Sequence, residues 1–251
     1  MNRKKIPLIP PILHNDIFIT DMCEKANIFN NYFATQCSPI INGSILPQFQ
    51  YKTASRLPTI EINRRSINNI IYSLNPNKSH GWDSISVKMV KICGDSIVFP
   101  LSIIFEDCLT NGIYPSKWKK SNVCPIHKKD CKSLIKNYRP ISLLPVFDKI
   151  FEKIIRDSLY DYFTSNQILN KSQSGFRKGD SCVAQLLAIV HNIHKNLDSF
   201  PSTDTRGIFL DMSKVFDKVW HKGLLFKLRS YGVEGNILSL ICDFLSERQY
   251  L

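Results

Sequence analysis

Apolar residues recur every three or four positions in several stretches of the chain, a spacing that places them on one face of a helix. Asp21 followed by Glu24 has the form of a capping box. Phe29 and Phe33 then continue the apolar series, so a helix is predicted from Asp21 to a point before Pro39. The same reasoning predicts helices over residues 63–74, 84–94, 96–111, 145–163, 180–197, 222–231 and 236–246.

Two shorter runs have the length and composition of strands. Residues 122–127 form one, and Gly207–Leu210 form another that ends on an acid and has the apolar character of a buried strand. Residues 1–20, which contain three prolines, predict an extended connector with little regular structure, and residues 42–58 predict a loop. The whole pattern favours a mixed fold of the α+β class.

The net charge of the chain indicates which class of partner it binds. The 251 residues carry a net charge of +12, and 43% of them are hydrophobic, as in an ordinary globular protein. An excess of cations favours a polyanion such as nucleic acid. The most basic segment, residues 117–139, interleaves its cations with Trp118 and Tyr138, which suits a groove that binds phosphates and stacks on bases. A solvated charged loop is the alternative. The cations are Lys117, Lys119, Lys120, Lys128, Lys129, Lys132, Lys136 and Arg139.

The cysteine pattern indicates reduced thiols in an intracellular protein. The chain has eight cysteines and no CxxC pair. His191 and His194, with Cys182 upstream, are interpreted as polar helix positions because no second pair at ligand spacing accompanies them. No apolar run reaches the roughly 18 residues of a membrane span, so we expect a soluble protein without a membrane partner.

Asp211, at the end of the predicted buried strand, is the candidate for chemistry. A buried carboxylate costs free energy unless a cation pairs with it, and a divalent metal is one such cation. Taken alone, an acid at this position is more often a helix cap or a turn residue. Phe216 and Asp217 follow five and six residues later, which places an aromatic ring near whatever Asp211 holds.

Three runs of residues, in order, resemble the reverse transcriptase of non-LTR, LINE-like (jockey-type) retrotransposons. They are NYRPISLL at 137–144, QSGFRKG at 173–179 and FLDMSKVFDKVWH at 209–221. The resemblance extends over about residues 63–251. It implies the fingers and a partial palm of a right-hand polymerase, preceded by a helical N-terminal extension. The implied division is 1–62 as linker and helix, 63–120 as helical extension, 121–204 as fingers and 205–251 as partial palm.

The resemblance also implies residue roles in RNA-directed DNA polymerisation. Asp211 would be the catalytic acid and a ligand in a site for two Mg²⁺ ions. Arg139, with Lys136 beside it, would hold the incoming deoxynucleoside triphosphate. Phe216 would pack under the deoxyribose, although a buried anchor at the start of the next helix is the alternative. Arg177 would line the template side, or serve as a phosphate clamp or surface cation. Asp217 is interpreted as a helix-start acid and not as a ligand.

The implied partners are an RNA template, a DNA primer and deoxynucleoside triphosphates, with a location in the nucleus; the oligomeric state is not indicated. Met212 and Val215 depart from the residues usual in the family, so the turn under the nucleotide is expected to be repacked. The family's second acidic turn is not found before Leu251, which predicts a fragment that is inactive alone. A non-catalytic nucleic-acid-binding remnant and the product of a decayed element are the alternatives.

Overall fold

The computed structural model describes residues 9–36, 45–201, 203–212 and 214–250. It confirms a mixed composition of helices and small sheets, and each predicted helix is present with its ends within three residues of the prediction. The helices are α1 (Met22–Gln36), α2 (Arg64–Ser73), α3 (Val87–Cys93), α4 (Val98–Asn111), α5 (Val146–Ser165), α6 (Cys182–Leu197), α7 (His221–Ser230) and α8 (Gly235–Leu245).

Side-chain caps explain where several helices begin. The Glu24 N–H donates to Asp21 Oδ1 over 2.8 Å, so half of the predicted capping box forms. The Asn63 side chain accepts from the first turn of α2, and Ser86 does the same for α3. Such caps satisfy N–H groups that the helix itself leaves without a partner, which favours a helix start at these positions.

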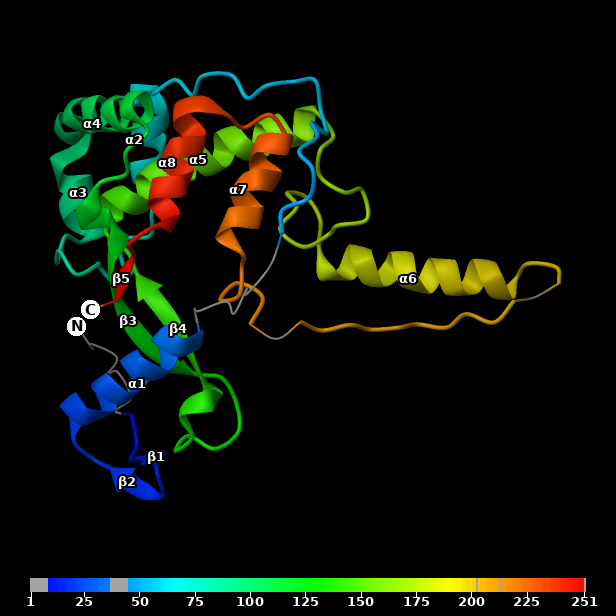
Figure 1. Cartoon of the computed structure of the whole chain (residues 1–251), viewed down its shortest axis with the longest axis horizontal. Coiled ribbons are helices and arrows are strands. Elements are labelled where there is room, and N and C mark those ends of the chain that lie inside the picture. The colour runs from blue at the N-terminus through cyan, green and yellow to red at the C-terminus, as the bar shows by residue number, and fades with distance from the viewer. Residues whose placement is uncertain (1–8, 37–44, 202, 213, 251) are drawn as a thin grey trace.

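The main core lies between α2, α4, α5 and α8 (Figure 1). Phe105 on α4 stacks on Phe151 on α5, with ring centroids 4.8 Å apart, and both side chains have no exposed surface. Trp118 and Tyr114 pack edge to face at the rim of this stack. The stripe of α2, including Ile67 and Ile71, is fully buried here, as its periodicity predicts.

A hairpin of β3 (Lys120–His127) and β4 (Tyr138–Leu143) projects from this body (Figure 1). The two strands are antiparallel, and the short β5 (Gln249–Tyr250) pairs in parallel with the start of β3. Helix α1 packs on one face of the hairpin, where Phe29 meets the ring of Tyr138 at 4.9 Å. Two strands, β1 (Ile12–His14) and β2 (Ile17–Ile19), complete this second core. The connector predicted over residues 1–20 is therefore wrong for residues 12–19, while residues 1–8 lie outside the described residues.

An irregular segment, residues 45–62, crosses the C-terminal half of α5 and the end of α7 (Figure 1). The Lys52 N–H donates to the Ser230 carbonyl and the Leu57 N–H donates to the Gly232 carbonyl. The hydroxyl of Tyr162 on α5 lies 3.0 Å from the Ser55 carbonyl oxygen. The loop predicted at 42–58 is confirmed from residue 45 onward, and residues 42–44 are not among those described.

Helix α6 and the segment that follows it differ from the rest. Helix α6 projects away from the body (Figure 1), and no side chain of α6, all of which are described, is buried. The predicted buried strand at Gly207–Leu210 is wrong: these residues are extended, but Ile208, Phe209 and Leu210 are 85–90% exposed. A strand needs a neighbour for its N–H and C=O groups, and no strand within the described ranges pairs with this run.

Candidate functional site

Asp211 lies in the exposed extended segment between α6 and α7. Within the described part of the chain its carboxylate makes no hydrogen bond or ion pair, and the neighbouring Met212 side chain is 73% exposed. The sequence argument that burial obliges this acid to find a cation therefore does not apply to this conformation. What the structure supports is an accessible carboxylate.

A two-metal site does not fit the described residues by themselves. Nowhere among them do three or more His, Cys, Asp or Glu side chains come close enough together to hold a metal ion. One carboxylate supplies too few hard oxygen ligands for two Mg²⁺ ions, each of which prefers six.

Phe216 lies in a single turn just after Asp211. The Lys218 N–H donates to the Lys214 carbonyl over 3.2 Å, which closes this turn ahead of α7. The Phe216 side chain is 75% exposed, so it is not the buried anchor that the sequence left open. Its ring packs edge to face against Phe176, with centroids 5.9 Å apart and planes at 88°. Two of the three sequence runs thus meet through this pair of rings.

The loop that carries Phe176 is fastened to α5. The Lys178 N–H donates to the Tyr160 hydroxyl over 2.9 Å, and the Lys178 ammonium lies 3.8 Å from Asp161. Within the loop, the Arg177 N–H donates to the Ser174 carbonyl. These contacts hold the QSGFRKG run beside the exposed turn of Phe216.

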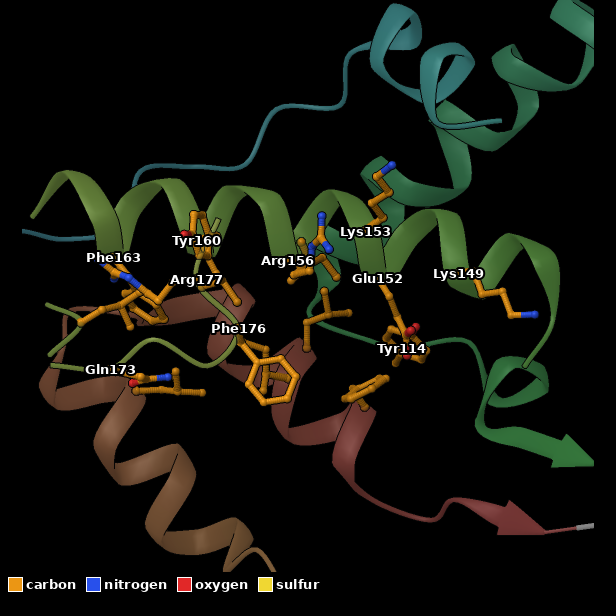
Figure 2. A pocket seen from close by; sticks show the side chains of 17 residues that line it. Tyr114, Lys149, Glu152, Lys153, Arg156, Tyr160, Phe163, Gln173, Phe176 and Arg177 are labelled. Carbon is orange, nitrogen blue, oxygen red and sulfur yellow. The ribbon is translucent and has the colours of Figure 1, made fainter. Parts of the chain in front are cut away.

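Arg177 lines a pocket of about 750 Å³ between α5, α7, α8 and this loop (Figure 2). Its Nη1 atom is buried and has no hydrogen-bond partner among the described residues. Figure 2 shows Phe176 and Gln173 reaching beneath α5 from the loop, with Glu152 and Tyr114 at the far end of the pocket. Because this guanidinium nitrogen is shielded from solvent, a ligand reaches it only if the surrounding side chains move, and the phosphate-clamp role of Arg177 stays a prediction.

Arg139 and Lys136, the predicted triphosphate-binding residues, lie on the β3–β4 hairpin and are exposed. Arg139 is opposite Ile126 in the strand register, and Lys136 is in a short 3-10 turn that leads into β4. The same hairpin and its connecting loop carry three further exposed cations, Lys128, Lys129 and Lys132. This arrangement gives the hairpin a cationic end able to contact phosphates.

Part of the predicted groove over residues 117–139 is wrong. Tyr138 is only 7% exposed, and Trp118 is half-buried against the main core, where its ring contacts Phe105 and Phe151, so neither ring lies free in a groove. Lys119 is 6% exposed, and its ammonium lies 2.6 Å from Asp243 Oδ1. Burial raises the pKa of Asp243, but hydrogen bonds from Lys119 and the Tyr114 N–H outweigh this effect and lower it. The prediction rested on the number of cations and aromatic rings in the segment, and composition does not reveal which of these side chains are buried.

The predicted site residues do not form one contact cluster, although the turn after Asp211 has a contact on the side of the hairpin and another on the side of the pocket. The Lys214 ammonium is 5.3 Å from the ring centre of Tyr32 on α1, the helix that packs against the hairpin. Phe216, two residues on, meets Phe176 beside Arg177. The turn after Asp211 therefore lies between the hairpin side and the pocket. No contact within the described ranges joins Arg139 or Lys136 directly to Asp211.

Sequence analysis missed a buried acidic cluster at the far end of the pocket. The Tyr114 hydroxyl donates to Asp148 Oδ1, while Asp148 Oδ2 is buried without a partner among the described residues. Burial raises the pKa of Asp148 to about 6 and that of Glu152, which also faces Asp148, to about 7. Burial and then Asp148 raise the pKa of Tyr114 as well. The available signal was the spacing of Asp148 from Phe151 and Ile155, which puts an acid on the apolar face of α5.

The C-terminal half of the chain, which holds these residues, matches a known protein family. Residues 126–250 match the family described as reverse transcriptase (RNA-dependent DNA polymerase). This range includes Arg139, Arg177, Asp211 and Phe216. No helix among the described residues is long and apolar enough to cross a membrane.

Curated relatives are similar over most of the chain. The "Probable RNA-directed DNA polymerase from transposon BS" of Drosophila melanogaster is 29% identical over 252 aligned residues, covering 91% of this chain and 26% of that protein. The RNA-directed DNA polymerase from the mobile element jockey is 29% identical in Drosophila melanogaster, covering 77% of this chain and 21% of that protein. Its Drosophila funebris counterpart is 28% identical, covering 90% and 25%. The chain thus spans about a quarter of the length of these relatives.

Proposed function

Because residues 126–250 belong to the reverse transcriptase family of non-LTR retrotransposons, we propose that this chain is part of an RNA-directed DNA polymerase. Its substrates are deoxynucleoside triphosphates, an RNA template and a DNA primer. The observation that carries the proposal is the family match, which includes all the predicted site residues. A location with access to chromosomal DNA, the nucleus, is part of the same proposal.

The β3–β4 hairpin is the proposed fingers element that binds phosphates. Arg139 offers a planar fork of donors that matches the oxygens of a triphosphate, and Lys136 adds a point charge close by in the chain. Their exposure supports this role because a phosphate ligand can reach both. Arg177, which lies in the loop beside the turn of Phe216 and is half-buried, is the proposed contact on the template side.

Asp211 is the proposed acid of the polymerising site, and Mg²⁺ is its proposed cation. Nucleotide addition depends mainly on positioning and on stabilising developing charge on phosphate oxygens. Two hard cations can supply that stabilisation, and Asp211 would be one carboxylate ligand among several. In the proposed arrangement Phe216 packs against the sugar, where a 2′-hydroxyl meets an apolar ring and loses its hydrogen bonds.

Binding of an RNA–DNA duplex tests the hairpin role. We expect affinity to fall linearly on a log–log plot as salt rises, because bound cations release counterions from the duplex. Replacing Lys128, Lys129 and Lys132 by Ala should reduce the slope by about two to three units. Replacing Lys78, Lys88 and Lys195, which are exposed and lie outside the hairpin, is the matched control. Equal slopes for the two triple variants would contradict a phosphate-binding hairpin.

Primer extension on poly(rA)·oligo(dT) with Mg²⁺ tests the chemistry. The 251-residue chain is compared with a version lengthened at its C-terminus by further polymerase sequence, each with and without Asp211→Ala. We expect Asp211→Ala to abolish extension in whichever form is active, whereas Asp204→Ala, seven residues earlier, leaves it intact. A folded, active protein that tolerates Asp211→Ala would remove Asp211 from the site. A lengthened form that is folded, binds duplex and adds no nucleotides would support the binding-remnant alternative.

A further inference from the structure

We propose that Phe176 is a positioning residue for Phe216, holding that ring at the angle it needs to sense the sugar of a bound nucleotide. Phe176 and Phe216 are 40 positions apart in the chain, and their side chains are 87% and 75% exposed. Two large apolar rings that solvent reaches nevertheless meet edge to face at 5.9 Å and 88°. The inference rests on the proposed function, since it assigns a task to the ring proposed to face the sugar.

The edge-to-face geometry restricts Phe216 more than a plain apolar contact would. The positive edge of one aromatic ring is attracted to the negative face of the other, so the pair has a preferred angle as well as a preferred distance. An exposed phenylalanine without such a partner moves among several side-chain rotamers. A ring that distinguishes a 2′-hydroxyl from a hydrogen must present one fixed surface, and the contact with Phe176 provides it.

The backbone of Phe176 points to the same role. Its φ is +62°, in the left-handed region that a bulky residue rarely occupies. A residue in this region stays there only where the surrounding structure holds it, and such residues gather at functional sites. Here the left-handed backbone places the aromatic ring beside the turn of Phe216, at the exposed side of the pocket beneath α5.

The two partners differ in how firmly they are held. The loop of Phe176 is bonded to α5 through Tyr160, and the Ser174 hydroxyl donates to Gln185 on α6. Among the described residues, the turn of Phe216 is closed by one backbone hydrogen bond, from the Lys218 N–H to the Lys214 carbonyl, and its Lys214 ammonium lies 5.3 Å from the ring centre of Tyr32. Phe176 is therefore the fixed member of the pair, and Phe216 is the member whose orientation depends on it.

The ring contact is tested first, without reference to activity, by ¹⁹F NMR of protein labelled with 4-fluorophenylalanine. Phe216→Leu identifies the Phe216 resonance as the one that disappears. We expect this resonance to move in Phe176→Leu, because loss of the neighbouring ring removes its magnetic shielding, and to stay in place in Phe200→Leu. Phe200 is the matched control, being fully exposed and without a ring contact among the described residues. An unchanged Phe216 resonance in Phe176→Leu overturns the proposal.

The role in sugar recognition is tested by equilibrium binding of dATP and ATP, which differ by one hydroxyl. We expect the ratio of the two dissociation constants to change about two- to tenfold in Phe176→Leu, the range of an aromatic pair. Phe176→Tyr retains the ring and should restore the ratio. A purely structural defect would weaken the binding of dATP and of ATP equally and leave the ratio of their dissociation constants unchanged.

The same measurement distinguishes failure of the proposed role of Phe216 from failure of the proposed role of Phe176. If Phe216→Ala leaves the dATP to ATP ratio unchanged, the proposed role of Phe216 fails, whatever Phe176 does. If Phe216→Ala changes the ratio but Phe176→Leu does not, the positioning role of Phe176 fails and the proposed function stands. If both change it and the double variant changes it no further than Phe216→Ala, the two rings act as one unit, as proposed.

Discussion

Helices α5 and α6 have similar sequence patterns but opposite surroundings. Both show an apolar stripe at helical spacing, and both begin and end where that stripe predicts. Ile150 and Phe151 on α5 have no exposed surface, whereas Val183 and Leu187 on α6 are 66% and 64% exposed. Periodicity therefore reveals which face of a helix can be buried, but it does not reveal whether anything covers that face.

The difference follows from what surrounds each helix. Helix α5 lies against α2 and the aromatic rings from α4, and the segment at residues 45–62 crosses its C-terminal half. Helix α6 is entered and left through irregular chain, and the apolar run at 207–210 that follows it is itself exposed. The body is thus held by buried contacts between distant parts of the chain, while α6 is held by its own hydrogen bonds and by exposed polar contacts such as that of Gln185 with Ser174.

The largest effect is expected at Gly232, where the crossing segment meets α5 and α7. Gly232 has a φ of +79°, and a Cβ there would lie 2.2 Å from the Ser55 carbonyl oxygen and 2.6 Å from the Tyr162 hydroxyl. We expect Gly232→Ala to lower the free energy of unfolding by about 3 kcal/mol or more, because strain and overlap add. Urea denaturation monitored by circular dichroism measures this loss.

Gly235 provides the control for that substitution. Its φ is also positive, at +64°, but an added Cβ would meet nothing within 4 Å. Gly235→Ala should therefore cost only the backbone term, about 1 kcal/mol. Equal losses at the two glycines would show that the crossing segment does not press on α5 in solution, and the contrast between body and α6 would weaken.

The second effect is a dependence of stability on pH that arises from burial on α5. The pKa values of Asp148 and Glu152 are raised to about 6 and 7, so the folded protein keeps protons that the unfolded chain releases near pH 4. Stability should consequently fall as pH rises from about 4 to 7 and then level off. The total effect is about 2–3 kcal/mol for each group, measured as the urea midpoint across this range.

Substitutions assign this dependence to the cluster. Asp148→Asn removes the ionisable group while keeping an oxygen that accepts from Tyr114, so it should flatten the pH profile and stabilise the protein above pH 7. Asp161→Asn changes an exposed acid on the same helix and should leave the slope unchanged. A slope that survives Asp148→Asn and Glu152→Gln together would show that the cluster is solvated.

Local chemistry made much of the fold predictable. Apolar stripes such as that of α2 determine helices from neighbouring residues alone, and this prediction is confirmed. The cap at Asn63 explains why α2 begins where it does. Strand β4 was not predicted, because Pro140 within it removes a backbone donor and weakens the strand pattern. Strand β5, of two residues, is too short to show a period at all.

The candidate site was predictable as residues but not as geometry. The three sequence runs identified Arg139, Arg177, Asp211 and Phe216, and their roles remain predictions. The contact between Phe176 and Phe216 joins positions 40 apart, which no local pattern encodes. The burial of Lys119 also depends on Asp243, more than a hundred residues later in the chain. Pairings of this kind require the folded chain.

The smallest effect is expected on α6, and it tests the contrast between α5 and α6 most directly. Leu187→Ala on α6 should change the free energy of unfolding by less than about 0.5 kcal/mol, because a side chain that is 64% exposed loses little burial. The same change at Leu240 on α8, which is 1% exposed, should cost about 3 kcal/mol through lost burial and a cavity. Both are measured by urea denaturation over a range of protein concentrations.

A loss of 2 kcal/mol or more at Leu187 that is independent of concentration would mean that another part of this chain covers α6 in solution. A loss that grows with concentration would mean that a second copy covers it. Either result would contradict the description of α6 as a helix without a packing partner.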